Sequence, residues 1–339
     1  MTLAALPLAP LLPAATPLRW LETHLAAHQA AHDADGPGAA TPRRWTGVGA
    51  LLDDDAAALH DLHAGLVADG AAPAAAAKWL ASWFAGGIAD VVGFVFATAS
   101  AALLVRPGRA RFRLDDGGLP DRVDPGPARV AVAEGHPWAE LSDVEVVADD
   151  GALAEAAVGA LTVAAEPIVE ACRCLARVGR PALWVEVGDR FGLPVLHQIH
   201  LPVDAAVADR MQYAVRTPSR PWRKVPDLRV ADTPDGWTYL GRKGGCCLAY
   251  QSDETGETSQ TGETDETGET DETGETALTE RARAYRARFP RLPDAPAYCS
   301  TCSLRDWPGC EERQVFWLAQ ERAARRAADE DMVDRAGDA

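Results

Sequence analysis

The sequence predicts an α+β protein with a helix-rich body, a small antiparallel sheet and a C-terminal segment that binds metal. Three observations support this prediction: long Ala-, Leu- and Val-rich stretches with helix-capping residues, short β-type segments between turn signals, and five of the seven cysteines in the final third. We expect four regions along the chain. They are an N-terminal helical region (1–72), a central α+β domain (73–240), a cysteine-bearing segment (241–310) and a C-terminal helix and tail (311–339).

Capping residues predict the first helices. Thr16 followed by Pro17 is typical of a helix start and predicts a helix over 17–32, because proline lacks only an N–H that would be unpaired there. The carboxylates of residues 53–55 favour the positive end of a second helix, which Gly70 can close. A third helix begins near Pro73, with a break expected at Gly86 and Gly87.

Residues 91–105 form the longest apolar run in the chain. Fifteen residues fall short of the roughly 20 that span a bilayer, and Asp90 and Arg106 bound the run. We therefore expect a buried core helix. Peripheral contact with the inner face of the cytoplasmic membrane is the alternative.

The middle of the chain changes from helical to β-type patterns and back. The segments 110–114, 128–133 and 144–147 are short and rich in Val, Phe and Leu, with Gly-, Asp- and Pro-rich stretches between them, which predicts the small antiparallel sheet. Helical patterns then return over 151–178, 181–192 and 204–214.

Residues 252–276 repeat Gly-Glu-Thr-Asp-Glu-Thr and contain no aliphatic or aromatic side chain. Such a segment buries no apolar area to offset an ordering cost of about 1–2 kcal/mol per residue, so we predict a disordered acidic insert. It also holds ten of the acidic residues, and removing them changes the net charge from −17 to −7.

The charge and the N-terminus limit the classes of function. A mildly acidic body without a basic stripe argues against nucleic acid as a partner, because phosphate contacts depend on Lys and Arg. Residues 1–16 are apolar but contain three prolines and no basic residue, unlike a secretory signal. We expect a cytoplasmic protein.

The cysteines give the sharpest functional signal: Cys246 and Cys247 are adjacent, Cys299 and Cys302 form a CxxC pair, and Cys310 follows. Thiols that cluster in a reducing compartment favour a metal site over disulfides. Zinc sites usually use two spaced pairs, whereas a two-iron cluster presents separated metal positions that adjacent thiolates can share. The pattern favours a [2Fe–2S] cluster. The adjacent pair needs a backbone kink, which Gly244 and Gly245 could supply.

These motifs, GRKGGCCLAYQ at 241–251 and YCSTCSL at 298–304, resemble the C-terminal signature of the ferric siderophore reductases named for FhuF. In that family Cys-Cys is followed, after about ten residues, by Cys-x-x-Cys. The stretch 78–132, with RFRLDDGGLP, and ALWVEVGDRF at 182–191 look similar to the family's central domain. The resemblance implies a [2Fe–2S] cluster with four ligands, namely Cys246, Cys247, Cys299 and Cys302.

This chain departs from the family pattern in two ways. Fifty-one residues separate Cys247 from Cys299, and the acidic insert accounts for much of the excess. Closing the longer loop costs only about 1.5 kcal/mol more, so the site can survive. Cys310 is the second departure, and it either replaces a family ligand or stays free.

The resemblance implies one-electron reduction of a ferric siderophore, with release of Fe(II) and supply of electrons by an external donor. Arg242 and Lys243 are candidate substrate-binding residues, and Trp222, Arg223 and Lys224 add aromatic and basic side chains upstream; ordinary surface charge is the alternative for the basic groups. Two other functions remain open: a structural zinc module within a binding domain, and a ligase similar to the siderophore synthetases, whose C-terminal domains resemble this family's central domain.

Overall fold

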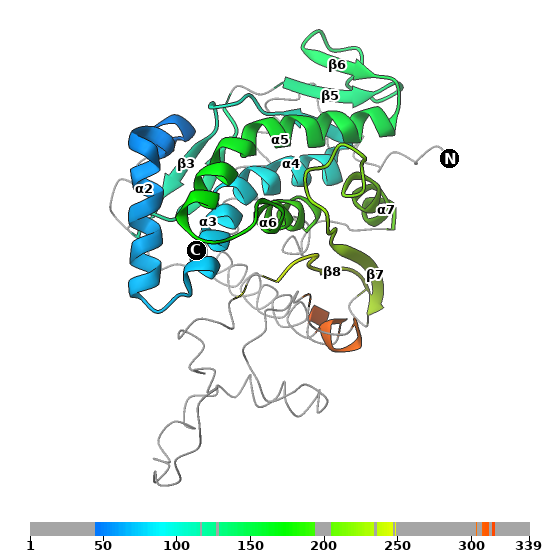
Figure 1. Ribbon diagram of the computed structural model, residues 1–339. Coiled ribbons are helices and arrows are strands. Elements are labelled where there is room, and N and C mark those ends of the chain that lie inside the picture. Colours follow the sequence, from blue (N-terminus) through cyan, green and yellow to red (C-terminus); the bar gives the residue numbers. More distant parts are fainter. Residues whose placement is uncertain are drawn as a thin grey trace, which may run out of the picture.

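The computed structural model describes residues 45–115, 117–126, 129–193, 205–233, 236–246, 248, 303, 307–311 and 314–315. The helix expected over 17–32 and the acidic insert lie outside these residues. Within them the protein is α+β, as predicted: helices surround one apolar core, and small, mainly antiparallel sheets lie at its edges (Figure 1).

Helix α4 (Ala85–Ala99) lies at the centre and contacts the surrounding helices α3 (Pro73–Trp83), α5 (Asp150–Leu175), α6 (Arg180–Gly192) and α7 (Ala205–Ala214). It is apolar on all sides, and almost every residue is buried, which is typical of a core helix. The break between α3 and α4 falls at Phe84, two residues before the predicted glycines.

The apolar run 91–105 is buried, as predicted, but it is not a single helix. Ser100 adopts a left-handed conformation with φ of 50° and ends α4, and Ala101–Leu104 continue as strand β2. The run contains neither Gly nor Pro at this point, so the sequence carries no conventional signal for the change. Apolar content predicted burial correctly but not the type of element.

The strands form three separate sheets. β1 (Trp45–Gly47), β3 (Arg111–Leu114) and β4 (Pro120–Asp124) pair antiparallel, whereas β5 (Arg129–Ala133) pairs antiparallel with β2 and parallel with β6 (Val144–Val147). The predicted strands 110–114 and 128–133 therefore exist but lie in different sheets. The third sheet is a hairpin of β7 (Asp227–Thr233) and β8 (Gly236–Arg242).

Local signals position the long helices. The Asp149 side chain accepts a hydrogen bond of 2.8 Å from Ala152 N and caps α5, and Pro181 lies in the first turn of α6. Helix α2 (Val48–Ala68) is interrupted by non-helical residues at Asp53–Ala56, so the carboxylates of residues 53–55 stand at the start of its second helical part, as predicted. α2 packs against α3 and α5, and its apolar residues join the same core as the rest of the body.

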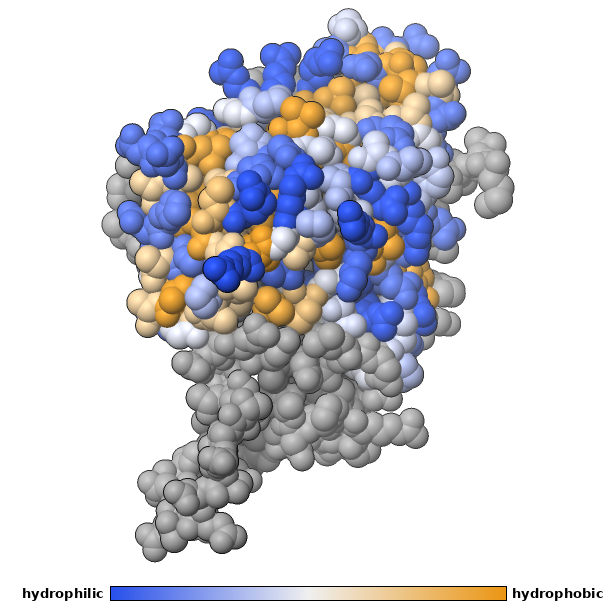
Figure 2. Space-filling view, viewed as in Figure 1, coloured by the Kyte–Doolittle hydropathy of each residue, from blue (hydrophilic) through white to orange (hydrophobic). Residues whose placement is uncertain are grey.

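Among the described residues two stretches are long and apolar enough to span a membrane by length and composition, Pro73–Ala99 and Asp150–Leu175. Of the most apolar 18-residue window in each, 83% and 50% are buried. The first contains the core helix α4. The second is α5, whose outer side carries Glu166 and Glu170 in ion pairs with Arg180. In Figure 2 hydrophilic side chains cover the middle of the face that α5 and α6 form.

Candidate metal centre

The loop after β8 carries the first predicted ligand pair. Lys243, Gly244, Gly245 and Cys246 follow the last strand residue, and Cys246 is a half-buried free thiol. A Cβ on Gly244 would lie 2.9 Å from the carbonyl oxygen of Val225, and a Cβ on Gly245 would overlap the side chain of Val185. The glycines therefore allow the loop to lie directly against the body.

A left-handed residue follows two positions after Cys246. Leu248 has a left-handed φ of 62°, and its N–H donates to Cys246 Sγ at 3.4 Å. We predicted that Gly244 and Gly245 would supply the kink, and the backbone does bend at both residues, although neither has a positive φ. The two glycines therefore combine the bend with close packing against the body.

The side chain of Asp189 in α6 accepts hydrogen bonds from the backbone of both glycines. Its Oδ1 accepts a hydrogen bond from Gly244 N at 2.7 Å, and its Oδ2 accepts one from Gly245 N at 3.3 Å. Burial raises the pKa of this carboxyl to about 8, and the neighbouring Glu186 adds to the shift, against the opposing effects of the glycine N–H groups and Lys243. Asp189 is therefore mainly protonated at neutral pH and adds little negative charge to the loop.

Lys78 of α3 binds the same loop from the other side. Its ammonium donates a hydrogen bond to the carbonyl oxygen of Cys246 and lies 3.0 Å from Glu186 Oε1. Among the described residues no donor makes a hydrogen bond to Glu186 Oε1, so the contact between Lys78 and Glu186 is an ion pair only. Lys243 Nζ lies 3.8 Å from the other oxygen of Glu186. Two ammonium groups thus flank one carboxylate, and both Lys78 and Glu186 are almost fully buried.

A short C-terminal helical turn, residues 307–311, packs against β7 and β8 and is shown in orange beside the hairpin in Figure 1. The indole N–H of Trp307 donates to Asp227, and the guanidinium of Arg229 lies 4.0 Å from the ring centroid. Arg242 lies 5.6 Å from the same centroid and 4.0 Å from Asp227. These contacts attach residues 307–311 to the hairpin that leads into the Cys246 loop.

Cys310 lies inside this contact and is fully buried. Gln314 Nε2 donates to its sulfur at 2.9 Å, and the same amide bonds the backbone of Gly241 at 2.8 and 2.9 Å. The thiol has a structural environment of its own within β8 and the C-terminal turn. This environment supports the interpretation that Cys310 is not a ligand.

The other predicted site residues have different outcomes. Of the four predicted ligands the structure describes Cys246, whereas Cys247, Cys299 and Cys302 lie outside the described residues, so the ligand assignment stays a prediction. In the described part of the chain no three Cys, His, Asp or Glu side chains form a metal site. Arg242 and Lys243 lie at the loop, as expected, but each has a protein partner, and their binding of substrate also stays a prediction.

The structure adds residues that the sequence reasoning did not select: Lys78, Glu186, Asp189 and Trp307. A signal for three of them exists in the sequence. Lys78 interrupts the apolar stretch PAAAAKWLASW, and Glu186 and Asp189, three residues apart, interrupt WVEVGDRF. Residues three apart share a helix face, and charges on an apolar face predict a buried polar cluster. Trp222, which we grouped with exposed basic residues, is buried against Gly188.

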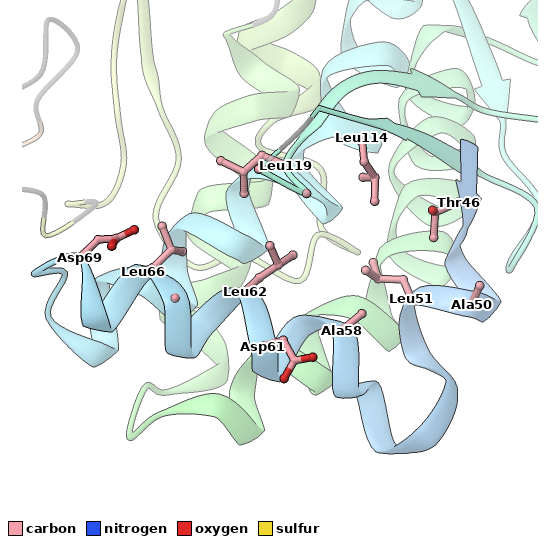
Figure 3. Close-up of a pocket in the computed structure, with 13 residues that line it drawn as sticks. Thr46, Ala50, Leu51, Ala58, Asp61, Leu62, Leu66, Asp69, Leu114 and Leu119 are labelled. Carbon is pink, nitrogen blue, oxygen red and sulfur yellow. The ribbon is translucent and has the colours of Figure 1, made fainter. Parts of the chain in front are cut away.

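A separate pocket of about 660 Å³ lies between α2 and the β3–β4 hairpin (Figure 3). Leucines from both sides line it, together with Thr46, Asp61 and Asp69. None of its lining residues comes from α6, β8 or the Cys246 loop, so the pocket is not part of the candidate metal centre.

Comparisons with family models, with characterised proteins and with solved structures each found no match.

Proposed function

We propose that this chain is a ferric siderophore reductase similar to the FhuF family, with a [2Fe–2S] cluster held by Cys246, Cys247, Cys299 and Cys302. The observation that carries the proposal is the contact between Trp307 and the β7–β8 hairpin. Because of it, the two cysteine pairs are connected to the same point of the fold from opposite sides of the acidic insert.

Chain length limits how far each pair can lie from this point. Cys302 precedes Trp307 by five residues, and Cys246 follows Arg242 by four. An extended residue spans at most about 3.5 Å, so the two cysteines lie within roughly 18 Å and 14 Å of their anchors. The length of the insert then has little effect on whether the thiols can meet, since protein contacts already close the loop.

The charge of the surroundings suits an anionic cluster. The ammonium groups of Lys78 and Lys243 lie 3.0 and 3.8 Å from the oxygens of Glu186, and the raised pKa of Asp189 reduces the negative charge near them. Positive groups beside a cysteine favour the thiolate form that binds iron. Cys246 is half-buried, so its thiol keeps some access to solvent. The described part of this loop therefore fits an anionic cluster.

When bound, a [2Fe–2S] cluster would supply electrons one at a time, and a ferric siderophore that gains one electron holds its iron less tightly, because its hard oxygen ligands prefer Fe(III). The protein's own residues position the ligands. Asp189 and Lys78 fix the loop backbone, and Trp307 fixes the segment of the second pair. We further propose that the protein works in the cytoplasm, receives electrons from an external donor and touches the inner face of the cytoplasmic membrane only peripherally.

Anaerobic purification tests this proposal. The protein should be brown, contain about two irons and two sulfides per chain, and give a rhombic electron spin resonance signal after reduction. Mixing the reduced protein with a ferric hydroxamate siderophore should reoxidise it, with Fe(II) trapped by a ferrous chelator. A colourless protein with one zinc would contradict the proposal and favour the structural zinc module. A brown protein that no ferric siderophore reoxidises would remove the reductase function alone.

A further inference from the structure

The cysteine loop contacts a buried cation, Lys78 of α3. Lys78 is 5% exposed, and it is connected to the loop by its hydrogen bond to the carbonyl oxygen of Cys246 and to α6 by its ion pair with Glu186. Lysine is almost never fully buried unless paired, and burying its charge costs several kcal/mol. A methionine would fill a similar volume in an alanine-rich helix without that cost. The free energy lost by burying the Lys78 charge therefore indicates that this charge has a function.

The ammonium of Lys78 lies close to the sulfur of Cys246, because it binds the carbonyl oxygen of the same residue. One hydrogen bond plus the covalent distance between the carbonyl oxygen and Sγ of one residue places the ammonium within roughly 8 Å of the Cys246 sulfur. Salt screens charges over a similar distance in water but much less between buried groups. The charge of Lys78 would therefore act strongly on an electron that enters a cluster held by the Cys246 sulfur.

We propose that Lys78 and Glu186 form a buried charge pair that tunes the reduction potential of the cluster, with Lys78 also positioning the Cys246 loop. This inference rests on the proposed function. Reduction adds one negative charge to the cluster, so the Lys78 ammonium favours the reduced form, and the Glu186 carboxylate opposes it. The two side chains shift the potential in opposite directions although they are in contact.

The test is a set of spectroscopic redox titrations, which need no siderophore. Glu186→Gln keeps the Lys78 hydrogen bond to Cys246 and removes one negative charge, so it should raise the potential. Lys78→Met removes the positive charge and should lower it. In each case we expect at least a tenfold change in the equilibrium constant for reduction, which is 59 mV for a one-electron couple.

Three further variants separate charge from packing. Lys78→Arg keeps the charge and should stay within a threefold change of the parent protein. Lys224→Met removes an exposed lysine near the same loop and should have no measurable effect, because solvent screens that charge. The double variant Lys78→Met/Glu186→Gln leaves no unpaired buried charge, and its potential should lie below that of Glu186→Gln alone.

The outcomes distinguish this inference from the proposed function. If Lys78→Met fails to fold, Glu186→Gln still shows the direction in which Glu186 shifts the potential. The difference between the double variant and Glu186→Gln then shows the direction of the Lys78 effect. A brown parent protein whose potential is the same in Glu186→Gln, or moves downward in it, would overturn the charge-pair proposal and leave the reductase intact. A colourless parent protein would overturn both.

Discussion

The indole N–H of Trp307 donates a hydrogen bond to the carboxylate of Asp227, 80 residues earlier in the chain. The ring also lies beneath the guanidinium of Arg229. One aromatic side chain therefore attaches residues 307–311 to the hairpin that precedes Cys246. The stability of the cluster should depend on this side chain although it is not a ligand.

We predict that Trp307→Ala weakens cluster retention and the attachment of the C-terminal turn by about 3 kcal/mol, because it removes a buried aromatic ring and its hydrogen bond. Trp307→Phe keeps most of the buried area and should lose less. The measurement is the rate of bleaching of the visible chromophore in excess chelator. Trp45→Ala is the control, since Trp45 is 40% exposed and should bleach at the parent rate. Equal rates in all variants would exclude this role of Trp307.

Serine substitutions test the ligand set. Each of the changes at Cys246, Cys247, Cys299 and Cys302 should abolish or strongly alter the chromophore, because serine oxygen is a poor replacement for thiolate. Cys310→Ser should keep it, since Gln314 holds that sulfur inside the contact with β8. Visible absorption and iron content give the result. A chromophore that is lost only with Cys310 would reverse the assignment.

Asp189 gives a pH dependence with a definite sign. Its folded pKa of about 8 lies above the ordinary value of 3.8, so between about pH 4 and pH 8 the folded protein holds one proton more than the unfolded chain. This carboxyl therefore lowers the free energy of unfolding as the pH rises through that window, by at most about 1.4 kcal/mol per unit.

Asp189→Asn should remove this contribution, because the amide oxygen still accepts from Gly244 N but carries no titrating proton. Urea midpoints at pH 5, 6, 7 and 8, followed by tryptophan fluorescence, should fall less steeply in the variant than in the parent. Asp143→Asn, at an exposed position, should parallel the parent. Parallel curves for all three proteins would show that Asp189 is ionised in the folded state.

Deleting residues 252–276 should leave cluster content unchanged and the free energy of unfolding equal or slightly higher. The deletion shortens the loop and removes ten negative charges, while Trp307 and Asp227 keep the same contact. Iron content and the rate of siderophore reduction, compared at matched ionic strength, decide the point. A tenfold slower reduction with the cluster intact would assign the insert a role in electron transfer or iron capture.

Much of the fold could be predicted from local signals. The helix predicted over 151–178 is α5, and the helix predicted over 181–192 matches α6 to within a residue, since Asp149 and Pro181 mark their starts. What the sequence could not indicate depends on distant contacts. The end of α4 at Ser100 has no glycine or proline to mark it, and which strands share a sheet follows from packing across the core.

The candidate site, like the fold, could be predicted only in part. Cysteine spacing identified the loop, and Cys246 lies in it, but spacing alone could not show what supports that loop. Lys78 is 168 residues from Cys246 in the chain, so only the packing of α3 against α6 brings its ammonium to that carbonyl. Cys172 and Cys174 of α5 differ for a similar reason: Cys172 faces the core, with a pKa raised by burial to about 12, and Cys174 is exposed.

The contacts that hold the Cys246 loop also bear on how the protein matures in the cell. Asp189 and Lys78 bind backbone groups of the loop, and Trp307 binds the Asp227 carboxylate, so these contacts require no metal ion. On the proposed function, the described part of the loop can therefore take its shape before any iron arrives. An assembly scaffold that delivers a preformed cluster would meet a folded acceptor with its thiols still unoccupied. Maturation would then be a transfer between two folded proteins, and newly made chains would survive iron starvation in a form ready to be loaded.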